Sequence, residues 1–316
     1  MPGPDPAAVP EADRPPLAVA PSHPRRLAYL GTPDVAVPPL RALHDAGFEI
    51  ALVVSRPDKR RGRGGALSPS PVKAAALELG LPVTDDLDAV LDAGVDLGVV
   101  VAYGRIIPRR VLEVVPMVNL HFSLLPRWRG AAPVERALLA GDDRTGVCLM
   151  EVAEGLDTGA VYAVEETPIA ADDTLDSLRG RLVDTGARMV VDALRAGLPT
   201  PTPQHGEPTH AAKIDPAELE LDWGRPAVEL DRVVRLGGAW TTFRGKRLKV
   251  WRATVLPEGG DTGAAGAAPG TLHGLDVATG AGTLRLEVVQ PEGKGRQEAA
   301  AWRNGTRPEP GERLGR

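Results

Sequence analysis

The chain has 316 residues, 43% of them hydrophobic and 25% charged, with a formal net charge of −5 at pH 7. These values are typical of a soluble globular protein of about two domains. The negative charge argues against a nucleic-acid-binding surface over the whole molecule, but it is compatible with a local basic patch. The single cysteine, Cys148, excludes an intramolecular disulfide framework and a cysteine zinc cluster, and its apolar neighbours predict a small core residue.

The N-terminal stretch, residues 1–24, is rich in proline and lacks both a basic region and a continuous apolar region. This pattern does not fit a signal peptide, and it predicts a disordered leader. No run of residues approaches the roughly 18 apolar residues of a transmembrane helix. We therefore expect a cytoplasmic protein.

The first predicted elements form a strand–helix–strand unit. Arg26–Gly31 and Glu49–Ser55 are apolar strands, and Pro38 and Pro39 suit the first turn of a helix between them. This order predicts a parallel α/β sheet. Further strands are expected at 95–102, 145–152 and 160–167, and helices at 72–79, 132–139 and 175–194. No G-x-G-x-x-G pattern follows the first strand, which argues against a nicotinamide cofactor.

An unusual basic loop, Arg56–Lys73, follows the second strand. It carries six basic residues against one acid, Asp58. Such a run is most often a solvated surface loop. The glycines beside its arginines would also let the backbone approach a phosphate chain, and guanidinium groups suit RNA. Both interpretations remain open from charge alone.

The pattern changes after a proline-rich linker at 199–211. Short strands are expected at 246–256, 272–278 and 283–290, separated by glycine-rich turns, and 258–270 is expected to be a hairpin loop. This spacing predicts a small β-domain with the strand pattern of a barrel. The segment Arg244–Arg252 forms a second basic patch, for which the alternative is an edge strand protected by charge.

The stretch Met117–Pro133 carries the strongest sign of chemistry. A strand with a period of two places Asn119, His121 and Ser123 on one face, and its apolar residues on the other. A polar row at the end of a buried strand costs burial energy unless it is hydrogen-bonded or used. Open α/β sheets bind ligands beyond the carboxyl ends of their strands, so we expect the active site here.

A carboxylate from another strand would complete this row. Asp157 lies in the turn Gly155–Gly159 between two predicted strands. Asn can donate to an oxyanion, His titrates near neutrality, and a carboxylate can fix the imidazole tautomer. No nucleophile elbow and no metal-ligand spacing accompany them. The set suits group transfer between two bound substrates through a tetrahedral intermediate.

The motifs NLHFSLLPRWRGAAP and TGVCLMEVAEGLDTG resemble those of the 10-formyltetrahydrofolate-dependent formyltransferase family. The matches GTPD, RPDKRRGRG, PSPVK and VVVAYG, with the appended β-domain, resemble the branch of that family that formylates methionyl-initiator-tRNA. The resemblance runs from about Arg26 to the C-terminus.

The resemblance implies a Rossmann-like formyltransferase domain at 25–198 and an OB-like tRNA-binding barrel at 212–316. It implies that the chain is an enzyme, a monomer without a metal, with 10-formyltetrahydrofolate as co-substrate and methionyl-initiator-tRNA as partner. It assigns catalysis to Asn119, His121 and Asp157. The residues it assigns to the folate loop are Ser123, Leu124, Leu125 and Pro126. Those it assigns to tRNA contact are Arg63 first, then Arg60 and Arg61.

Two departures from the family pattern are Phe122, where many relatives have Gly, and Ala160, where an acidic residue or proline is common. Neither belongs to the catalytic set. Three alternatives remain: a formyltransferase acting on a nucleotide-linked amino sugar, a purine-pathway transformylase, and a catalytically silent tRNA- or folate-binding protein. The basic patches count against the first, the C-terminal domain against the second, and the intact catalytic set against the third.

Overall fold

The computed structural model describes residues 14–61, 65–257, 266–309 and 311–315. The chain divides into two compact units. Unit 1 comprises residues 1–131, 146–167 and 180–210, and unit 2 comprises residues 132–145, 168–179 and 211–316. None of the described helices is long and apolar enough to cross a membrane.

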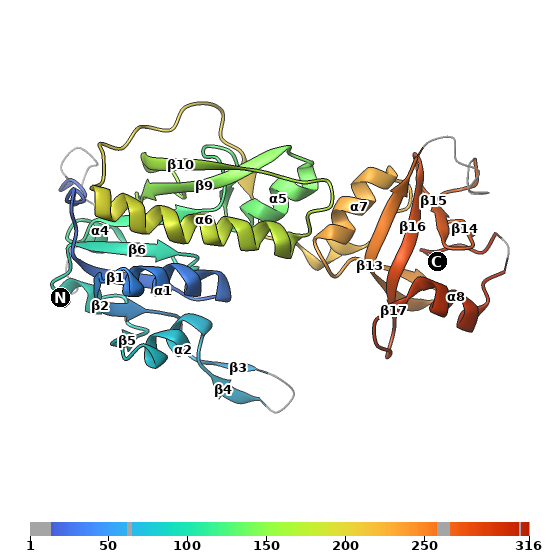
Figure 1. Ribbon diagram of the computed structural model, residues 1–316, viewed down its shortest axis with the longest axis horizontal. Coiled ribbons are helices and arrows are strands. Elements are labelled where there is room, and N and C mark those ends of the chain that lie inside the picture. Colours follow the sequence, from blue (N-terminus) through green and yellow to red (C-terminus); the bar gives the residue numbers. More distant parts are fainter. Residues whose placement is uncertain (1–13, 62–64, 258–265, 310, 316) are drawn as a thin grey trace, which may run out of the picture. The chain divides into compact units, whose positions relative to one another are not determined.

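Unit 1 is built on a seven-stranded sheet in the order β10-β9-β7-β6-β1-β2-β5 (Figure 1). The strands are β1 (Arg26–Gly31), β2 (Glu49–Val54), β5 (Val83–Thr84), β6 (Leu97–Val101), β7 (Met117–His121), β9 (Arg144–Glu151) and β10 (Val161–Pro168). The pairs from β5 through to β7 are parallel, whereas β9 is antiparallel to β7. The parallel sheet expected from the sequence is thus confirmed in its centre, and its edge is mixed.

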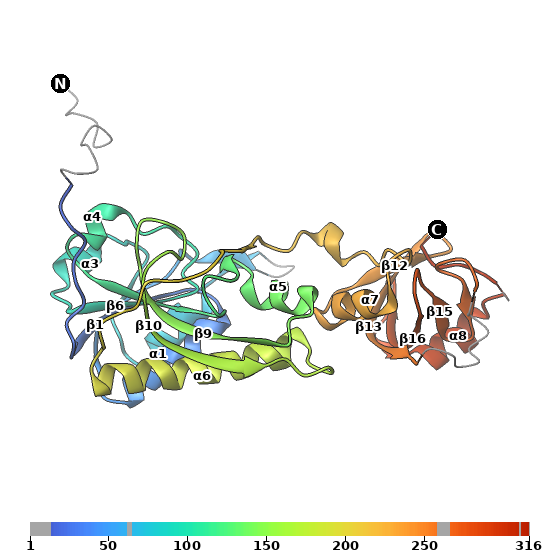
Figure 2. The same cartoon turned by 90° about the horizontal axis from the view of Figure 1, so that it is seen from above.

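Helices cover both faces of this sheet. They are α1 (Val37–Asp45), α2 (Pro71–Glu78), α3 (Ala89–Asp92), α4 (Arg109–Leu112) and α6 (Leu175–Ala196). Figure 2 shows α1 and α6 on one side of the sheet, and α3 and α4 on the other. Pro71 opens α2, and the side chain of Ser70 caps it by accepting from the Lys73 amide at 3.0 Å.

The apolar face of β7 packs toward α6. A Cβ atom built on Gly186 of α6 would lie 3.4 Å from the ring of Phe122 and 3.5 Å from Leu120. Both side chains therefore lie on the α6 side of the sheet, as the alternation of the strand predicted. The polar row is left to the opposite side.

Two segments of unit 1 differ from their prediction. Within the expected basic loop, β3 (Lys59–Arg61) and β4 (Ala66–Ser68) pair as a short antiparallel hairpin. Residues 1–13 of the expected leader lie outside the described residues, but its second half packs on unit 1. The Ala18 amide donates to the Leu112 carbonyl at 2.8 Å, and the Leu198 amide donates to the Ser22 carbonyl at 2.7 Å. These backbone bonds and the contact of Leu17 with the core replace the disorder expected for residues 14–24.

Unit 2 contains an antiparallel sheet in the order β12-β13-β16-β15-β14, with β17 paired to β16. The strands are β12 (Trp240–Phe243), β13 (Lys246–Leu256), β14 (Leu272–His273), β15 (Asp276–Ala278), β16 (Thr283–Pro291) and β17 (Gln297–Glu298). Helices α5 (Pro133–Ala140), α7 (Ala227–Arg235) and α8 (Ala299–Thr306) belong to the same unit. The predicted strand at 272–278 is split in two, because the chain turns at Gly274, whose φ is 66°.

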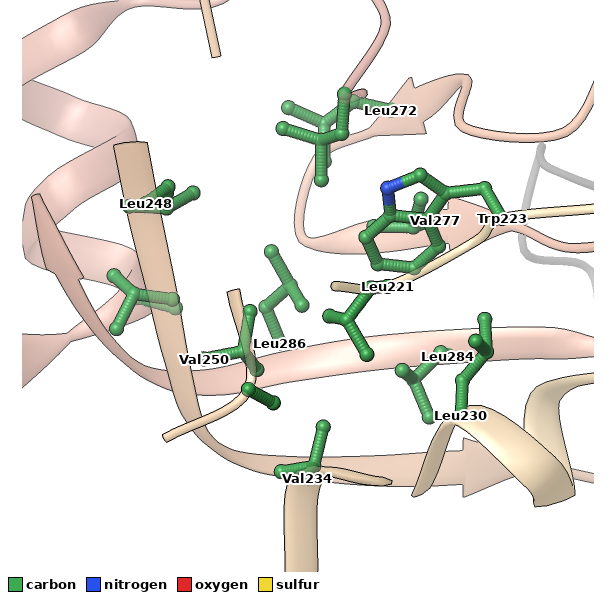
Figure 3. Close-up of a cluster of buried hydrophobic side chains, with 14 of the residues drawn as sticks. Leu221, Trp223, Leu230, Val234, Leu248, Val250, Leu272, Val277, Leu284 and Leu286 are labelled. Atoms are coloured by element: carbon green, nitrogen blue, oxygen red, sulfur yellow. The ribbon is translucent and has the colours of Figure 1, made fainter. Parts of the chain in front are cut away.

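One side of this sheet holds the core of unit 2 (Figure 3). Leu248 and Val250 of β13 and Leu284 and Leu286 of β16 are at most 1% exposed, and they pack with Leu230 of α7. Alternate residues of β13 must then point to the other side of the sheet. The C-terminal β-domain predicted from the sequence is confirmed. Among the described residues the sheet runs from β12 to β14, and no strand ladder joins these two edges.

Four short elements remain. They are β8 (Arg129–Gly130), β11 (His210–Ala211), a 3₁₀ turn at Asp34–Ala36 in unit 1 and another at Pro216–Leu219 in unit 2. The second turn begins with a capping box, in which Asp215 and Glu218 satisfy each other's backbone amides.

Candidate active site

Asn119 and His121 lie at the carboxyl end of β7, two residues apart on one side of the sheet. His121 is 5% exposed, whereas Asn119 is the one residue of β7 that is only half-buried. Within the described part of the chain, the side-chain amide of Asn119 has no hydrogen-bond partner. A half-exposed amide beside a buried imidazole is available to donate to a bound carbonyl oxygen.

The imidazole of His121 is held between two acceptors. Its Nε2 lies 2.9 Å from the carbonyl oxygen of Trp128, and its Nδ1 lies 3.6 Å from Oδ2 of Asp157. Nε2 can donate a hydrogen bond to the Trp128 carbonyl, whereas the 3.6 Å between Nδ1 and the Asp157 carboxylate is the separation of an ion pair. The ring therefore has a fixed orientation and a carboxylate that would stabilise its positive charge.

The carboxylate of Asp157 is itself anchored by the backbone. Its Oδ2 accepts a 2.7 Å hydrogen bond from the Gly130 amide, and its side chain is 14% exposed. Burying a carboxylate costs several kcal/mol unless donors or a cation compensate it. The Gly130 amide and the His121 ring provide this compensation.

The turn between β9 and β10 presents Asp157 in a left-handed conformation, with a φ of 51°. Asp tolerates this conformation better than most residues other than Gly. Thr158 closes the turn by donating to the Gly155 carbonyl at 3.1 Å. A Cβ atom at Gly159 would lie 2.0 Å from the carbonyl oxygen of Glu151, so only glycine fits. The residues of the LDTG motif thus fix the backbone conformation that positions the Asp157 carboxylate.

Two contributors to this site were missed by the sequence analysis, because both lie in the segment predicted to be a linker. The amide nitrogen of Gln204 donates to the carbonyl oxygens of Asp157 (2.9 Å) and Gly159 (2.8 Å), and its oxygen accepts from Arg129 at 2.7 Å. The Thr209 hydroxyl oxygen accepts from the Trp128 amide at 2.8 Å. Proline-rich composition gives no sign of these contacts, which depend on where the segment crosses the domain.

The predicted folate loop follows β7 directly. Ser123 is fully buried, and its hydroxyl donates to the Arg127 carbonyl at 2.6 Å. The Arg127 amide closes the turn by donating to the Leu124 carbonyl at 3.0 Å. Leu124, Leu125 and Pro126 are half-buried. In the structure Ser123 holds the loop together, and the three apolar residues are the ones that retain accessible surface.

Cys148 lies opposite His121 in the pairing of β7 with β9. It is fully buried, and burial raises the pKa of its thiol to about 11. A thiol with this pKa stays protonated and unreactive at neutral pH. The prediction of a small core residue is confirmed.

Two of the three arginines predicted to contact tRNA, Arg60 and Arg61, lie on β3. The guanidinium of Arg60 donates to the Gly65 carbonyl at 3.1 Å and is exposed. Arg61 ends β3, where its backbone pairs with Ala66. Arg63 lies outside the described residues. Asp58, the one acid of the loop, forms a 2.8 Å ion pair with Lys73, so its charge is already compensated.

Two further features of the described residues do not add to the site. A cavity of about 750 Å³ lies in unit 2 between α7, β13 and the segments 138–143 and 169–174, and no predicted site residue lines it. Three or more His, Cys, Asp or Glu side chains that could hold a metal ion do not meet anywhere in the part of the chain that the structure describes.

Two family models cover most of the chain. Residues 25–194 match the formyl transferase model, and residues 213–307 match the model of the formyl transferase C-terminal domain. The chain belongs to the formyl transferase family.

Its most similar relatives indicate one subgroup of this family. The chain is 45% identical over 304 residues to a methionyl-tRNA formyltransferase of Jannaschia sp. (strain CCS1), which covers 90% of this chain and 98% of the relative. It is 44% identical to a methionyl-tRNA formyltransferase of Symbiobacterium thermophilum, over 89% of this chain and 92% of the relative. Its sequence thus groups it with the methionyl-tRNA formyltransferases of that family.

Solved structures share the fold at low sequence identity. An N-formyltransferase from Helicobacter canadensis superposes with a TM-score of 0.63 at 15% identity, covering 82% of this chain and 98% of that one. HypX from Aquifex aeolicus, in complex with tetrahydrofolic acid, gives a TM-score of 0.61 at 18% identity, covering 89% of this chain and 47% of HypX. At this identity the likeness concerns the fold alone.

Proposed function

We propose that this chain transfers a formyl group from 10-formyltetrahydrofolate to the α-amine of methionyl-initiator-tRNA, giving formylmethionyl-tRNA for translation initiation. The observation that carries the proposal is the set of Asn119, His121 and Asp157 at the end of β7. His121 and Asp157 lie 3.6 Å apart, and the Asn119 amide is accessible. The similarity to methionyl-tRNA formyltransferases over about nine-tenths of the chain supports the choice of substrate.

In the proposed reaction the uncharged α-amine attacks the formyl carbon bound to N10 of the folate. A new carbon–nitrogen bond forms, and the carbonyl oxygen becomes an oxyanion. Asn119 donates a hydrogen bond to this oxyanion, and His121 donates a second one through Nε2 when that N–H leaves the Trp128 carbonyl. The bond from carbon to N10 then breaks, and N10 takes a proton from His121. The proton that the amine loses passes by way of the Asp157 carboxylate to the imidazole, so both residues end in their starting state.

Asp157 is the residue that orients His121 in this scheme. Its Oδ2 is anchored by the Gly130 amide, so the imidazole faces a fixed negative charge throughout the reaction. The carboxylate assists removal of the proton from the attacking amine. Charge that develops on the imidazole is compensated without movement of the protein, which is the condition for efficient electrostatic stabilisation.

Substrate contacts are assigned to three further regions. Ser123, Leu124, Leu125 and Pro126 form the folate loop, in which the half-buried apolar residues offer the contact surface. Arg63, with Arg60 and Arg61, contacts the acceptor stem of the tRNA. The C-terminal domain, with an OB-like topology at 212–316 after a linker at 199–211, binds the body of the tRNA. The enzyme acts as a cytoplasmic monomer.

The test is a transfer assay with the purified chain, 10-formyltetrahydrofolate and charged initiator tRNA. We expect formylmethionyl-tRNA and tetrahydrofolate in equal amounts. Formylation of a nucleotide-linked amino sugar but not of tRNA would contradict the substrate. Binding of both substrates without any transfer would contradict the enzyme.

A further inference from the structure

A short segment of unit 1, residues 204–209, contacts both loops of the active site, and we call it the strap. Only Gln204 and Thr209 of the strap are half-buried, and the four residues between them are exposed. The side chain of Thr209 binds the backbone of the first loop, residues 128–130, and that of Gln204 binds the backbone of the second loop, residues 155–159. The strap thus joins two loops that are distant from each other along the chain.

The first loop contacts both His121 and Asp157. The Trp128 carbonyl oxygen lies 2.9 Å from Nε2 of His121, and the Gly130 amide donates to the Asp157 carboxylate at 2.7 Å. Because a single residue separates Trp128 from Gly130, a movement of this loop would change both contacts at once. The position of the first loop therefore sets the positions of the imidazole and the carboxylate together.

Both ends of the strap bind the first loop. The Thr209 hydroxyl oxygen accepts from the Trp128 amide at 2.8 Å, and the Thr209 carbonyl oxygen accepts from the Arg129 amide at 2.9 Å. Oε1 of Gln204 accepts from two nitrogens of the Arg129 guanidinium, at 2.7 Å and 3.1 Å. The first loop is therefore bound through its backbone by Thr209 and through a side chain by Gln204.

Gln204 also binds the second loop, through the other end of the same amide group. Its Nε2 donates to the carbonyl oxygens of Asp157 at 2.9 Å and Gly159 at 2.8 Å. A guanidinium can only donate and a carbonyl oxygen can only accept, so a side-chain amide in this orientation satisfies both loops. A carboxylate at this position would keep the contact with Arg129, but its other oxygen would face two carbonyl oxygens without a proton to donate.

Each loop contains a residue whose backbone lies in the left-handed region. The φ angle is 62° for Trp128 and 51° for Asp157. This conformation is uncommon for residues other than glycine, and in a bulky residue such as tryptophan it persists only where surrounding contacts hold it. The Trp128 amide donates to Thr209, and the Asp157 carbonyl oxygen accepts from Gln204. The strap thus binds the strained residue of each loop.

We propose that Gln204 is a positioning residue for formyl transfer, which holds the second loop to the first so that the Asp157 carboxylate faces the His121 imidazole at the observed 3.6 Å. The inference deepens the proposed function and rests on it for the reaction that is measured. Gln204 acts through Asp157 and needs no contact with either substrate. Its loss should therefore lower the turnover of bound substrates and leave their binding unchanged.

Two substitutions of Gln204 separate its contacts, and Asp96→Ala serves as the control. Gln204→Met is similar in length and uncharged, and it removes every hydrogen bond of the amide group. Gln204→Glu keeps an acceptor for Arg129 but removes both donor bonds to the second loop. Asp96 also joins two segments of unit 1, at the amino ends of β1 and β6, where its carboxylate accepts from the Arg25 and Arg26 amides at 2.9 Å each. The control thus removes a similar pair of bonds at the opposite ends of the strands from the active site.

Steady-state transfer is measured with 10-formyltetrahydrofolate and charged initiator tRNA, each varied in turn. We expect kcat of both Gln204 variants to fall about tenfold or more, with KM for either substrate within about twofold of the wild type. Asp96→Ala should lower the melting temperature and leave kcat unchanged. In the Asp157→Asn background, Gln204→Met should lower kcat by less than about twofold, because the charge that Gln204 positions is already lost.

Two results would overturn the inference while the proposed function stands. The first is wild-type kcat in a folded Gln204 variant. The second is a fall in kcat for Gln204→Met that is as large in the Asp157→Asn background as in the wild type, which would mean that Gln204 does not act through Asp157. If neither Gln204 variant folds, Thr209→Val decides by the same assay, since it removes only the hydroxyl that accepts from the Trp128 amide. A lower kcat at unchanged KM is expected, and wild-type kcat would overturn the inference.

A wild type that transfers no formyl group would overturn the proposed function, and the strap would then be tested without the reaction. The ¹⁵N NMR signals of the His121 ring, assigned by their loss in His121→Gln, report the hydrogen bonds of the imidazole. They should change in Gln204→Met and stay as in the wild type in Asp96→Ala. Unchanged signals in Gln204→Met would overturn the positioning role.

Discussion

Charge is compensated in opposite ways in the active-site region of unit 1 and on the surface of unit 2 where Arg247 and Arg296 stack on Trp240 and Trp251. His121 and Asp157 are nearly buried, and each has protein partners at fixed distances. Arg247 and Arg296 are exposed, and they lie against aromatic rings without a carboxylate. A buried charge must be compensated by the protein itself, so the reacting groups are in place before any substrate arrives. An exposed cation is already hydrated, so its charge can be kept for a ligand at little cost.

The largest expected effect is on the charge of Asp157. Asp157→Asn keeps an oxygen that can accept from the Gly130 amide, but it removes the negative charge beside His121. We expect kcat for formyl transfer to fall by about 10²-fold or more, and the same for Asn119→Ala, which removes the oxyanion donor. Single-turnover transfer measures this, and the melting temperature of each variant should stay near that of the wild type. Near wild-type turnover in folded Asp157→Asn would show that transfer does not depend on this charge, and in folded Asn119→Ala it would show that transfer does not depend on the amide donor.

A second variant tests whether the backbone of the LDTG turn sets the site. Gly159→Ala would place a Cβ atom 2.0 Å from the carbonyl oxygen of Glu151. The backbone of Glu151 is itself held in place, because its amide donates a 2.8 Å hydrogen bond to the carbonyl oxygen of Ala160. Backbone atoms must move to relieve this overlap. We expect the free energy of unfolding to fall by about 1–3 kcal/mol, with a loss of transfer activity. Urea denaturation measures the first effect.

The control for Gly159 is a glycine of helix α6. A Cβ atom at Gly180 meets no atom within 4 Å, so Gly180→Ala should raise stability by about 0.5–1 kcal/mol and leave activity unchanged. Equal loss of stability in both variants would show that the close approach at Gly159 is not the cause.

A smaller, pH-dependent effect concerns Cys148, which lies opposite His121 on β9. Burial raises the pKa of its thiol from 9.0 to about 11, so in the folded state it keeps its proton where the unfolded chain loses it. The contribution of the neutral thiol to the free energy of unfolding is fully present below pH 9, and it is lost as the pH rises through about 11. At pH 10 the thiol should lower stability by about 1 kcal/mol relative to pH 8, compared with Cys148→Ala measured at the same two pH values. An identical pH dependence in wild type and variant would contradict this.

The strands and helices of unit 1 were largely predictable because each carries its own local pattern. The bounds of β1 match those expected from the sequence, and α2 and β10 are displaced by one residue. Helix α7 and strand β12 were not predicted. Helix α7 carries its apolar residues at helical spacing, but it follows a turn rich in charge and glycine. The signals for both elements are short, and their stability comes from the core of unit 2 that they complete.

The sequence by itself determined the chemistry offered at the end of β7. A period of two assigns Asn119 and His121 to one face, and the LDTG motif supplies an acid, because both facts depend only on neighbours along the chain. Only the tertiary structure decided that the Trp128 carbonyl and the Gly130 amide hold these groups, and that Gln204 fastens the turn that carries Asp157. The same holds for the basic segment Arg244–Arg252, which could have been an ordinary charged edge strand. The stacking of Arg247 and Arg296 on two rings, without a carboxylate, arises from residues on separate strands and turns. Contacts between distant segments carry no periodic signal, so their partners become known only when the chain is folded.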